Sequence, residues 1–409
     1  MALANENYLK TPEIYYFDEI EKRINAYRLI HPNAKIIRLG IGDVTQPLPG
    51  EVRSAMHKAV DEMASAETFK GYGPPHGYDF LIEKIVKEYR SSGISIDKDC
   101  VFINSGAKSD LGNIGHVLGR DNIIAIAEPV YPVYENATIM SGRAGMLNDI
   151  DQKWSNIVYL RCTEDTDFVP ELPDEKVDVI YLCNPNNPTG TVLTKTELKR
   201  WVDYALEHHS IIIYDAAYQA FITEENVPRS IYEIKGAKKV AIELRTYSKM
   251  AGFTGLRCGY SVFPHELVVF TRMGEQVPLI KLWSRRKSNY TNGVSYIVQR
   301  GAEAVHSRKG RAECMELVNY YLKNASLIKN ELQQLGFKTY GGINSPYVWF
   351  ETPDGMNSWK FFNQLLYELN IVGTPGIVFG PSGDRYMRFT GFSSYEDTRI
   401  AIDRFKSSF

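Results

Sequence analysis

The residue whose surroundings best suit covalent chemistry is Lys249, in the stretch TYSKMAGFTGLR that begins at position 246. Hydroxyl side chains precede it at Thr246 and Ser248, glycines follow it, and Arg257 stands eight residues further on. Hydroxyls, glycine-exposed amides and an arginine together make a site for an anion such as phosphate. A lysine beside a bound phosphate can form a Schiff base with an aldehyde cofactor. Taken alone, the stretch is equally typical of a solvated lysine in a flexible loop.

A carboxylate ends an apolar run upstream of this lysine. Asp215 follows the residues SIIIY, and Tyr218 stands three positions later. Ligands of an open parallel sheet bind at the carboxyl ends of its strands. A buried carboxylate there needs a cationic partner, and a protonated pyridine nitrogen would be one. The alternative for Asp215 is an ordinary helix cap.

Polar groups also follow three other apolar runs. Asn187 lies in CNPNNPTG, where prolines and a glycine fix an irregular loop. Ala107 and Lys108 stand where a helix is expected to begin, and its free N–H groups can bind phosphate. Tyr131 is held between prolines in EPVYPVY. Each of these has a structural alternative, as a turn, a cap or a core aromatic.

A late arginine, Arg388, interrupts the apolar run YMRF. A buried arginine needs an anion, and its planar guanidinium suits a carboxylate. An internal ion pair with an acidic side chain is the alternative.

The elements that must position these residues alternate between helix and strand from about 49 to 290. Helical patterns occupy 51–64, 77–91 and 195–209, and short apolar runs occupy 101–103, 123–126, 177–182, 210–214 and 240–242. Continuous apolar runs separated by helices predict a mostly parallel sheet covered on both faces.

The pattern changes after 293. A long helix is expected over 294–335, followed by strands at 347–350 and 386–389 with a helix at 358–369 between them. We therefore predict an α/β fold with a large domain, 49–292, and a smaller α+β domain made of 1–48 and 293–409.

Composition excludes several classes of protein. The 409 residues carry a net charge of −2, so no positive field exists to hold nucleic acid. No apolar stretch reaches the roughly 18 residues of a membrane span. The five cysteines form no CxxC pair, which favours a reducing, cytoplasmic location and predicts no structural metal site. No GxGxxG motif joins the first strand to a helix, which argues against an NAD-binding dehydrogenase. The basic run at 285–287 is interpreted as a loop near a dimer interface or the substrate entrance.

In combination and in this order, NPNNPTG, DAAY, SKMAGFTGLR and the late arginine resemble the motifs of fold-type I, pyridoxal-phosphate-dependent aminotransferases of class I/II. A closer resemblance, to the LL-diaminopimelate aminotransferase family, is carried by 36–49, 68–77, 251–260, 282–286, 292–299 and 373–383. It implies conversion of tetrahydrodipicolinate and L-glutamate to LL-diaminopimelate and 2-oxoglutarate, in lysine biosynthesis. It also implies pyridoxal 5′-phosphate as cofactor.

The resemblance implies catalytic roles for three residues. Lys249 would form the Schiff base with the cofactor and carry the proton, Asp215 would pair with the pyridinium nitrogen, and Tyr218 would contact the phenolate oxygen. The implied cofactor-binding residues are these three with Tyr72, Ala107, Lys108, Tyr131, Asn187, Thr246, Ser248, Arg257 and Asn292. The implied substrate-binding residues are Tyr15, Gly42, Lys108, Tyr131, Asn187, Asn292 and Arg388. Tyr72 and Asn292 resemble residues supplied across a subunit interface, which implies a homodimer with shared active sites.

The chain departs from that family at several positions, among them two on the substrate side. An acidic residue credited there with binding the distal ammonium of diaminopimelate is replaced by Pro75, which has neither charge nor N–H donor. A glycine is replaced by Val378, which is expected to fill a substrate-side loop.

These departures leave alternatives open. One is a paralogous aminotransferase that acts on a different amino acid. Another is a pyridoxal-phosphate-dependent oxidase or lyase on the same scaffold. A non-catalytic binding protein is a third, and the joint presence of Lys249, Asp215 and Arg388 argues against it.

Overall fold

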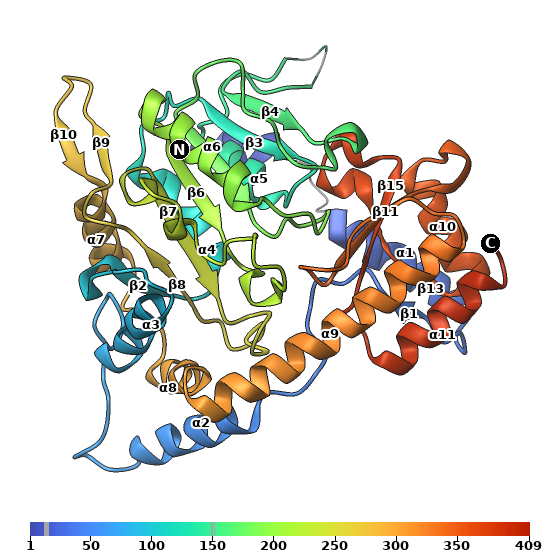
Figure 1. Ribbon diagram of the computed structural model, residues 1–409, viewed down its shortest axis with the longest axis horizontal. Coiled ribbons are helices and arrows are strands. Elements are labelled where there is room, and N and C mark those ends of the chain that lie inside the picture. The colour runs from blue at the N-terminus through green and yellow to red at the C-terminus, as the bar shows by residue number, and fades with distance from the viewer. Residues whose placement is uncertain (12–15, 149, 151) are drawn as a thin grey trace.

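The computed structural model describes residues 1–11, 16–148, 150 and 152–409 (Figure 1). A central sheet with its helices forms one part of the molecule, and a smaller sheet with its helices lies beside it. The helix α9 (Arg308–Gln334) runs from the helices beneath the first part to the second sheet (Figure 1). The predicted α/β fold with a second, smaller α+β part is confirmed. The division at 49 and 292 stays a prediction.

In the described residues, seven strands form the central sheet in the order β2-β8-β7-β6-β5-β3-β4. Their bounds are β2 Val101–Asn104, β3 Ile124–Glu128, β4 Ile157–Arg161, β5 Val179–Cys183, β6 Ile211–Asp215, β7 Ala241–Thr246 and β8 Gly259–Val262. The sheet is mostly parallel, as predicted, and only β8 runs antiparallel to both of its neighbours. The sequence interpretation had omitted β4 and β8.

Helices accompany this sheet in the larger part of the molecule. They are α2 Gly50–Glu62, α3 Asp79–Ser91, α4 Ala107–Ile114, α5 Val133–Met140, α6 Lys195–His208 and α7 Leu279–Tyr290. At the start of α6, Thr194 and Glu197 satisfy each other's backbone N–H groups in a capping box. Outside the sheet, β9 Val268–Phe270 and β10 Gln276–Pro278 form a projecting hairpin (Figure 1).

The smaller sheet is antiparallel, in the order β11-β12-β15-β14. Its strands are β11 Thr339–Gly341, β12 Tyr347–Glu351, β14 Thr374–Pro375 and β15 Tyr386–Thr390. Packed around it are α1 Tyr16–Ile30, α10 Ser358–Leu369 and α11 Tyr395–Lys406, with the short parallel pair β1 Ile37–Arg38 and β13 Ile371–Val372. The N-terminal segment therefore joins the C-terminal part of the chain.

The long helix expected over 294–335 is wrong in one respect, because two helices occupy it. The first, α8 Tyr296–Val305, packs against α2, and α9 begins after a break at 306–307. Ser307 is extended and accepts a hydrogen bond from the Gly310 amide, so it caps α9 and ends the helical run.

Within the described residues, no helix combines the length and apolar character needed to cross a membrane. All five cysteines are free thiols.

Candidate active site

A cavity of about 360 Å³ lies where strands of the central sheet end, and residues of both sheets line it. Twelve predicted site residues are among its lining: Gly42, Ala107, Lys108, Tyr131, Asn187, Asp215, Tyr218, Thr246, Ser248, Lys249, Arg257 and Arg388. They come from segments spread over most of the chain. The structure therefore brings together residues that the sequence connects only through their motifs.

Lys249 follows β7 and points into this cavity. Its Nζ donates a hydrogen bond to the backbone oxygen of Gly42 and lies 5.6 Å from the centre of the Phe392 ring. Burial lowers the pKa of the Lys249 amine from its ordinary 10.5 to about 8, although Asp43 opposes the change. An amine with that pKa has a substantial neutral fraction in mildly alkaline solution, and the neutral form is the nucleophile.

Asp215 ends β6 on the floor of the cavity and is 5% exposed. Its carboxylate accepts hydrogen bonds from the Tyr134 hydroxyl at 2.8 Å and the Ala217 amide at 3.1 Å. Burial raises the pKa of Asp215 from 3.8 to about 6, and these two bonds oppose the rise. Within the described chain, no cationic side chain offsets the burial of this carboxylate. The arrangement suits a ligand that brings its own N–H cation.

Donors for an anion gather at the other end of the cavity. The Thr246 and Ser248 hydroxyls lie 2.8 Å apart, and the Arg257 guanidinium reaches Ser248 Oγ at 3.4 Å. Arg257 also lies against Gly106 at the start of α4. A Cβ atom on residue 106 would stand 2.6 Å from Nη2 of Arg257. Because the first N–H groups of a helix have no helical partner, α4 adds backbone donors at Ala107 and Lys108. Hydroxyls, a guanidinium and a helix N-terminus together fit a phosphate group.

The smaller sheet supplies the opposite wall. Arg388 of β15 is 2% exposed and donates to Asn187 Oδ1 at 2.6 Å and to the Gly40 oxygen at 2.7 Å. Its guanidinium lies 4.5 Å from the centre of the Tyr347 ring. A Cβ atom at Gly42 would stand 3.2 Å from the Tyr347 hydroxyl, so glycine keeps this side of the cavity open.

Two of the predicted site residues that the structure describes do not line the cavity. Tyr72 is 92% exposed and Asn292 is exposed, and neither lines it. Tyr15 lies outside the described residues.

The two departures from the family pattern also lie away from the cavity lining. Val378 is buried in the core and does not line the described cavity, and its effect on a substrate-side loop stays a prediction. Beside Pro75, the His76 ring bonds to Ser284 Oγ at 3.0 Å and packs on Phe102.

Sequence reasoning missed two tyrosines of the cavity. Tyr134 supports Asp215, and the Tyr347 hydroxyl lies 2.6 Å from that of Tyr218. The motif EPVYPVY contains Tyr134 three residues after Tyr131, and a spacing of three at a helix start was the available signal. No local motif marks Tyr347.

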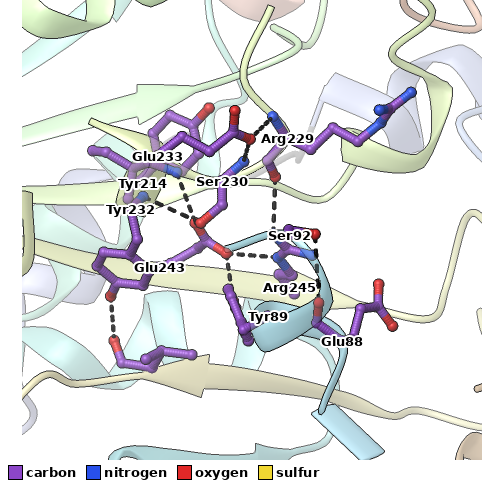
Figure 2. A network of polar contacts seen from close by, with 12 residues as sticks. Glu88, Tyr89, Ser92, Tyr214, Arg229, Ser230, Tyr232, Glu233, Glu243 and Arg245 are labelled. Carbon is purple, nitrogen blue, oxygen red and sulfur yellow. Dashed lines mark hydrogen bonds and ion pairs between the residues drawn. The ribbon is translucent and has the colours of Figure 1, made fainter. Parts of the chain in front are cut away.

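A second polar network lies in the middle of β7, apart from the cavity lining (Figure 2). Glu243 accepts hydrogen bonds from Arg245 Nε at 2.6 Å, from the Ser230 hydroxyl at 2.6 Å and from the Tyr89 hydroxyl. Glu243 is fully buried and Arg245 nearly so. This network fastens β7 to α3 and to the 229–233 segment, and none of these side chains lines the cavity.

One group of described residues brings possible metal ligands within 4.8 Å of one another: Asp97, Asp99, Cys100 and His265. It lies outside the cavity, and three of its members are exposed. His265 Nε2 stands 3.0 Å from Asp99 Oδ1, so a hydrogen bond or ion pair between these two side chains accounts for their approach.

Comparison with known proteins agrees with this geometry. Residues 34–405 match the family "Aminotransferase class I and II". The chain is 55% identical over 408 residues to the LL-diaminopimelate aminotransferase of Bacteroides thetaiotaomicron, covering 100% of both chains. It is 56% identical over 407 residues to that of Parabacteroides distasonis, covering 99% of each.

A solved structure gives the same result. L,L-Diaminopimelate aminotransferase from Chlamydomonas reinhardtii superimposes with a TM-score of 0.93 at 38% identity, covering 100% of this chain and 99% of that one. The resemblance to these proteins thus extends from the motifs to the whole length and the whole fold. The chain belongs to the class I and II aminotransferases, enzymes that use pyridoxal phosphate.

Proposed function

We propose that this enzyme is an LL-diaminopimelate aminotransferase, which moves the amino group of L-glutamate to tetrahydrodipicolinate in lysine biosynthesis. Relatives that are more than half identical over their full length carry that name. The observation that carries the chemistry is one cavity that holds both an amine and a carboxylate with shifted pKa values, Lys249 and Asp215.

The donor set of the cavity fits pyridoxal phosphate. Asp215 would accept the N–H of the pyridinium ring, which supplies the cation that its burial calls for. Tyr218 and Asn187 would bond the phenolate oxygen, and Tyr131 would pack on the ring. The phosphate would lie among Thr246, Ser248, Arg257 and the start of α4. When bound, the cofactor supplies an aldehyde for amines and a ring that accepts electrons from the substrate Cα.

Lys249 would have two tasks in this cavity. Its Nζ would hold the cofactor's aldehyde carbon until a substrate amine replaces it. The released amine would then take the proton from the substrate Cα and deliver it elsewhere in the same cavity as a general base and acid. A pKa of about 8 suits both tasks, because a general base works best near the ambient pH.

Arg388 would bind the α-carboxylate of the substrate. Its guanidinium is buried beside Asn187, and a two-pronged contact with a carboxylate would orient the Cα–H bond toward Lys249. Gly42 would leave room for that carboxylate beside Tyr347.

The proposal includes a homodimer with shared active sites. The loop between α2 and α3 extends away from the body of the chain and presents Phe69 and Tyr72 to solvent (Figure 1). A second subunit would cover these side chains and receive Tyr72 and Asn292 at its phosphate end. Chains carrying Tyr72→Ala and chains carrying Lys249→Ala should therefore regain activity when co-expressed, since a hybrid dimer keeps one intact site. No recovery above the separate variants would contradict the sharing.

The test of function is a half-reaction with purified holoenzyme. LL-diaminopimelate and L-glutamate should each convert the bound cofactor to its amine form, which absorbance follows directly. The Lys249→Ala variant should show no rapid conversion. A product formed without the amine form of the cofactor would point instead to an oxidase or lyase.

A second candidate is an aminotransferase for a different amino acid, and Pro75 favours it because the position carries no charge. Conversion with glutamate and another amino acid, but silence with LL-diaminopimelate, would establish this candidate. In that case Pro75→Glu should introduce activity toward LL-diaminopimelate.

A further inference from the structure

The basic run Arg285-Arg286-Lys287 does not form the loop expected from the sequence. It lies on α7, and its three side chains have different surroundings. Arg285 is exposed, whereas Arg286 packs on Trp283 and Tyr290 and donates to Asn113 Oδ1 of α4. Lys287 is buried at 4% exposure. A buried lysine on a surface helix calls for an explanation, because its charge is costly to remove from water.

Lys287 reaches a buried polar cluster under the start of α4. Its Nζ donates to the Ile103 oxygen at 3.0 Å and lies 4.0 Å from Asp110 Oδ1. The other Asp110 oxygen accepts from Asn104 Nδ2 at 2.6 Å and from Ser261 Oγ at 2.7 Å. Burial raises the pKa of Asp110 and lowers that of Lys287, and each charge opposes the shift of the other.

This cluster ends at the turn that faces the anion site. Asn104, oriented by Asp110, uses its Oδ1 to accept the Gly106 amide at 3.0 Å. Gly106 has a φ of +96°, and Ala107 and Lys108 follow it directly as the first residues of α4. Arg257 lies against the same glycine. Asp110 is itself on α4, so the cluster fixes this helix start from both sides.

We propose that Asp110 and Lys287 are positioning residues for the cofactor phosphate: through Asn104 they hold the turn at Gly106 so that the amides of Ala107 and Lys108 and the guanidinium of Arg257 converge on one point. This inference rests on the proposed function. Neither side chain lines the cavity, so both act through the turn.

A purely structural role would stabilise the sheet and leave the phosphate site unchanged, so the test needs a buried pair elsewhere as its control. Glu243 and Arg245 are such a pair on the same sheet, and their side chains bond to each other and to residues 89, 229 and 230 rather than to the turn. Apo-proteins carrying Asp110→Asn, Lys287→Met or Glu243→Gln would be titrated with pyridoxal phosphate. The ³¹P resonance of the bound cofactor and the thermal unfolding midpoint would be recorded for each.

Asp110→Asn and Lys287→Met should each weaken cofactor binding by about tenfold or more, the scale of one lost charge-assisted hydrogen bond, and should move the ³¹P resonance. Glu243→Gln should lower the unfolding midpoint yet leave the Kd and the resonance as in the wild type. Equal effects of the Asp110 and Glu243 variants on the Kd, or an unmoved ³¹P resonance, would overturn the inference.

The Asp110 and Lys287 variants could fail to fold, so a milder variant, Ser261→Ala, is included. It removes a single hydrogen bond to Asp110 and keeps both charges of the buried pair. It should weaken cofactor binding by roughly threefold, at the low end of the range for a single hydrogen bond, because Asn104 and Lys287 still hold Asp110. An unchanged Kd would count against the inference. Wild-type protein that fails to bind pyridoxal phosphate would instead refute the proposed function. Normal binding by the wild type and by all Asp110 and Lys287 variants would refute only the positioning role.

Discussion

Two carboxylates are buried on neighbouring strands of the central sheet, and their surroundings are opposite. Glu243, on β7, is met by the Arg245 guanidinium and by two hydroxyl groups (Figure 2). Asp215, at the end of β6, is met among the described residues only by the Tyr134 hydroxyl and the Ala217 amide. The protein therefore compensates one buried charge itself and leaves the other uncompensated beside a cavity. The difference separates a group that supports the fold from one arranged to meet a cationic ligand.

Glu243→Gln should have the largest effect on stability. It would leave the Arg245 guanidinium buried without its counter-charge, which costs roughly 3–5 kcal/mol of unfolding free energy. Urea denaturation of the apo-protein measures the change. The variant's turnover, measured well below its unfolding temperature, should stay within a few-fold of the wild type. A large loss of turnover in folded protein would remove the distinction between the two carboxylates.

Asp215→Asn should show the reverse pattern. An amide cannot hold a proton on a pyridine nitrogen, so kcat/KM should fall by roughly 10² to 10³, the scale for loss of one preorganised electrostatic group. The free energy of unfolding of the variant apo-protein should be at least as high as that of the wild-type apo-protein. Steady-state kinetics at saturating cofactor and urea denaturation test both halves. Unchanged kinetics would contradict the assigned role.

The pH dependence of stability sharpens the contrast further. The folded pKa of Asp215 is about 6 and its ordinary value is 3.8, so the folded apo-protein binds this proton more tightly than the unfolded chain. Its contribution to stability is therefore lost as pH rises from about 4 to about 6, by on the order of 3 kcal/mol. The stability difference between wild type and Asp215→Asn should grow across that window and level off above it. Parallel pH curves would contradict this account.

The smallest effects should come from a matched pair of tyrosine variants. Tyr134→Phe removes a hydroxyl from Asp215, and Tyr89→Phe removes one from Glu243. Each should cost about 1 kcal/mol of stability, the usual worth of one hydrogen bond. Only Tyr134→Phe should alter the pH titration of the bound cofactor's absorbance, because only Asp215 faces it. Equal spectral changes in both variants would show that the surroundings of Asp215 and those of Glu243 are not independent.

Apolar runs and motif order predicted most of the fold and most of the site. The apolar runs that correspond to β2, β3, β5, β6 and β7 are buried almost without interruption, and a continuous apolar run is the pattern that predicts a buried strand. β8 escaped notice because Gly259–Val262 follows directly on the motif around Lys249 and reads as part of its loop. The break before α9 depends on Ser307, whose capping role needs a hydrogen bond that helical periodicity does not reveal.

The missed site residues have a common cause. Tyr347 reaches the cavity from β12 of the smaller sheet, and its contact with Tyr218 joins positions 129 residues apart. The sequence placed Lys287 in a loop near a dimer interface or the substrate entrance, because charge in a sequence carries no sign of burial. Contacts between distant segments arise from packing, and a local pattern holds no record of them.

The contact between Gly106 and Arg257 limits how this site can change in evolution. Any side chain at 106 would stand 2.6 Å from the guanidinium, and the backbone there already has a φ of +96°. A larger residue at 106 would therefore have to move the guanidinium away from the anion site, and it would also hold a backbone conformation that residues with a side chain rarely adopt. Glycine is therefore expected to persist at 106 for as long as Arg257 binds the anion.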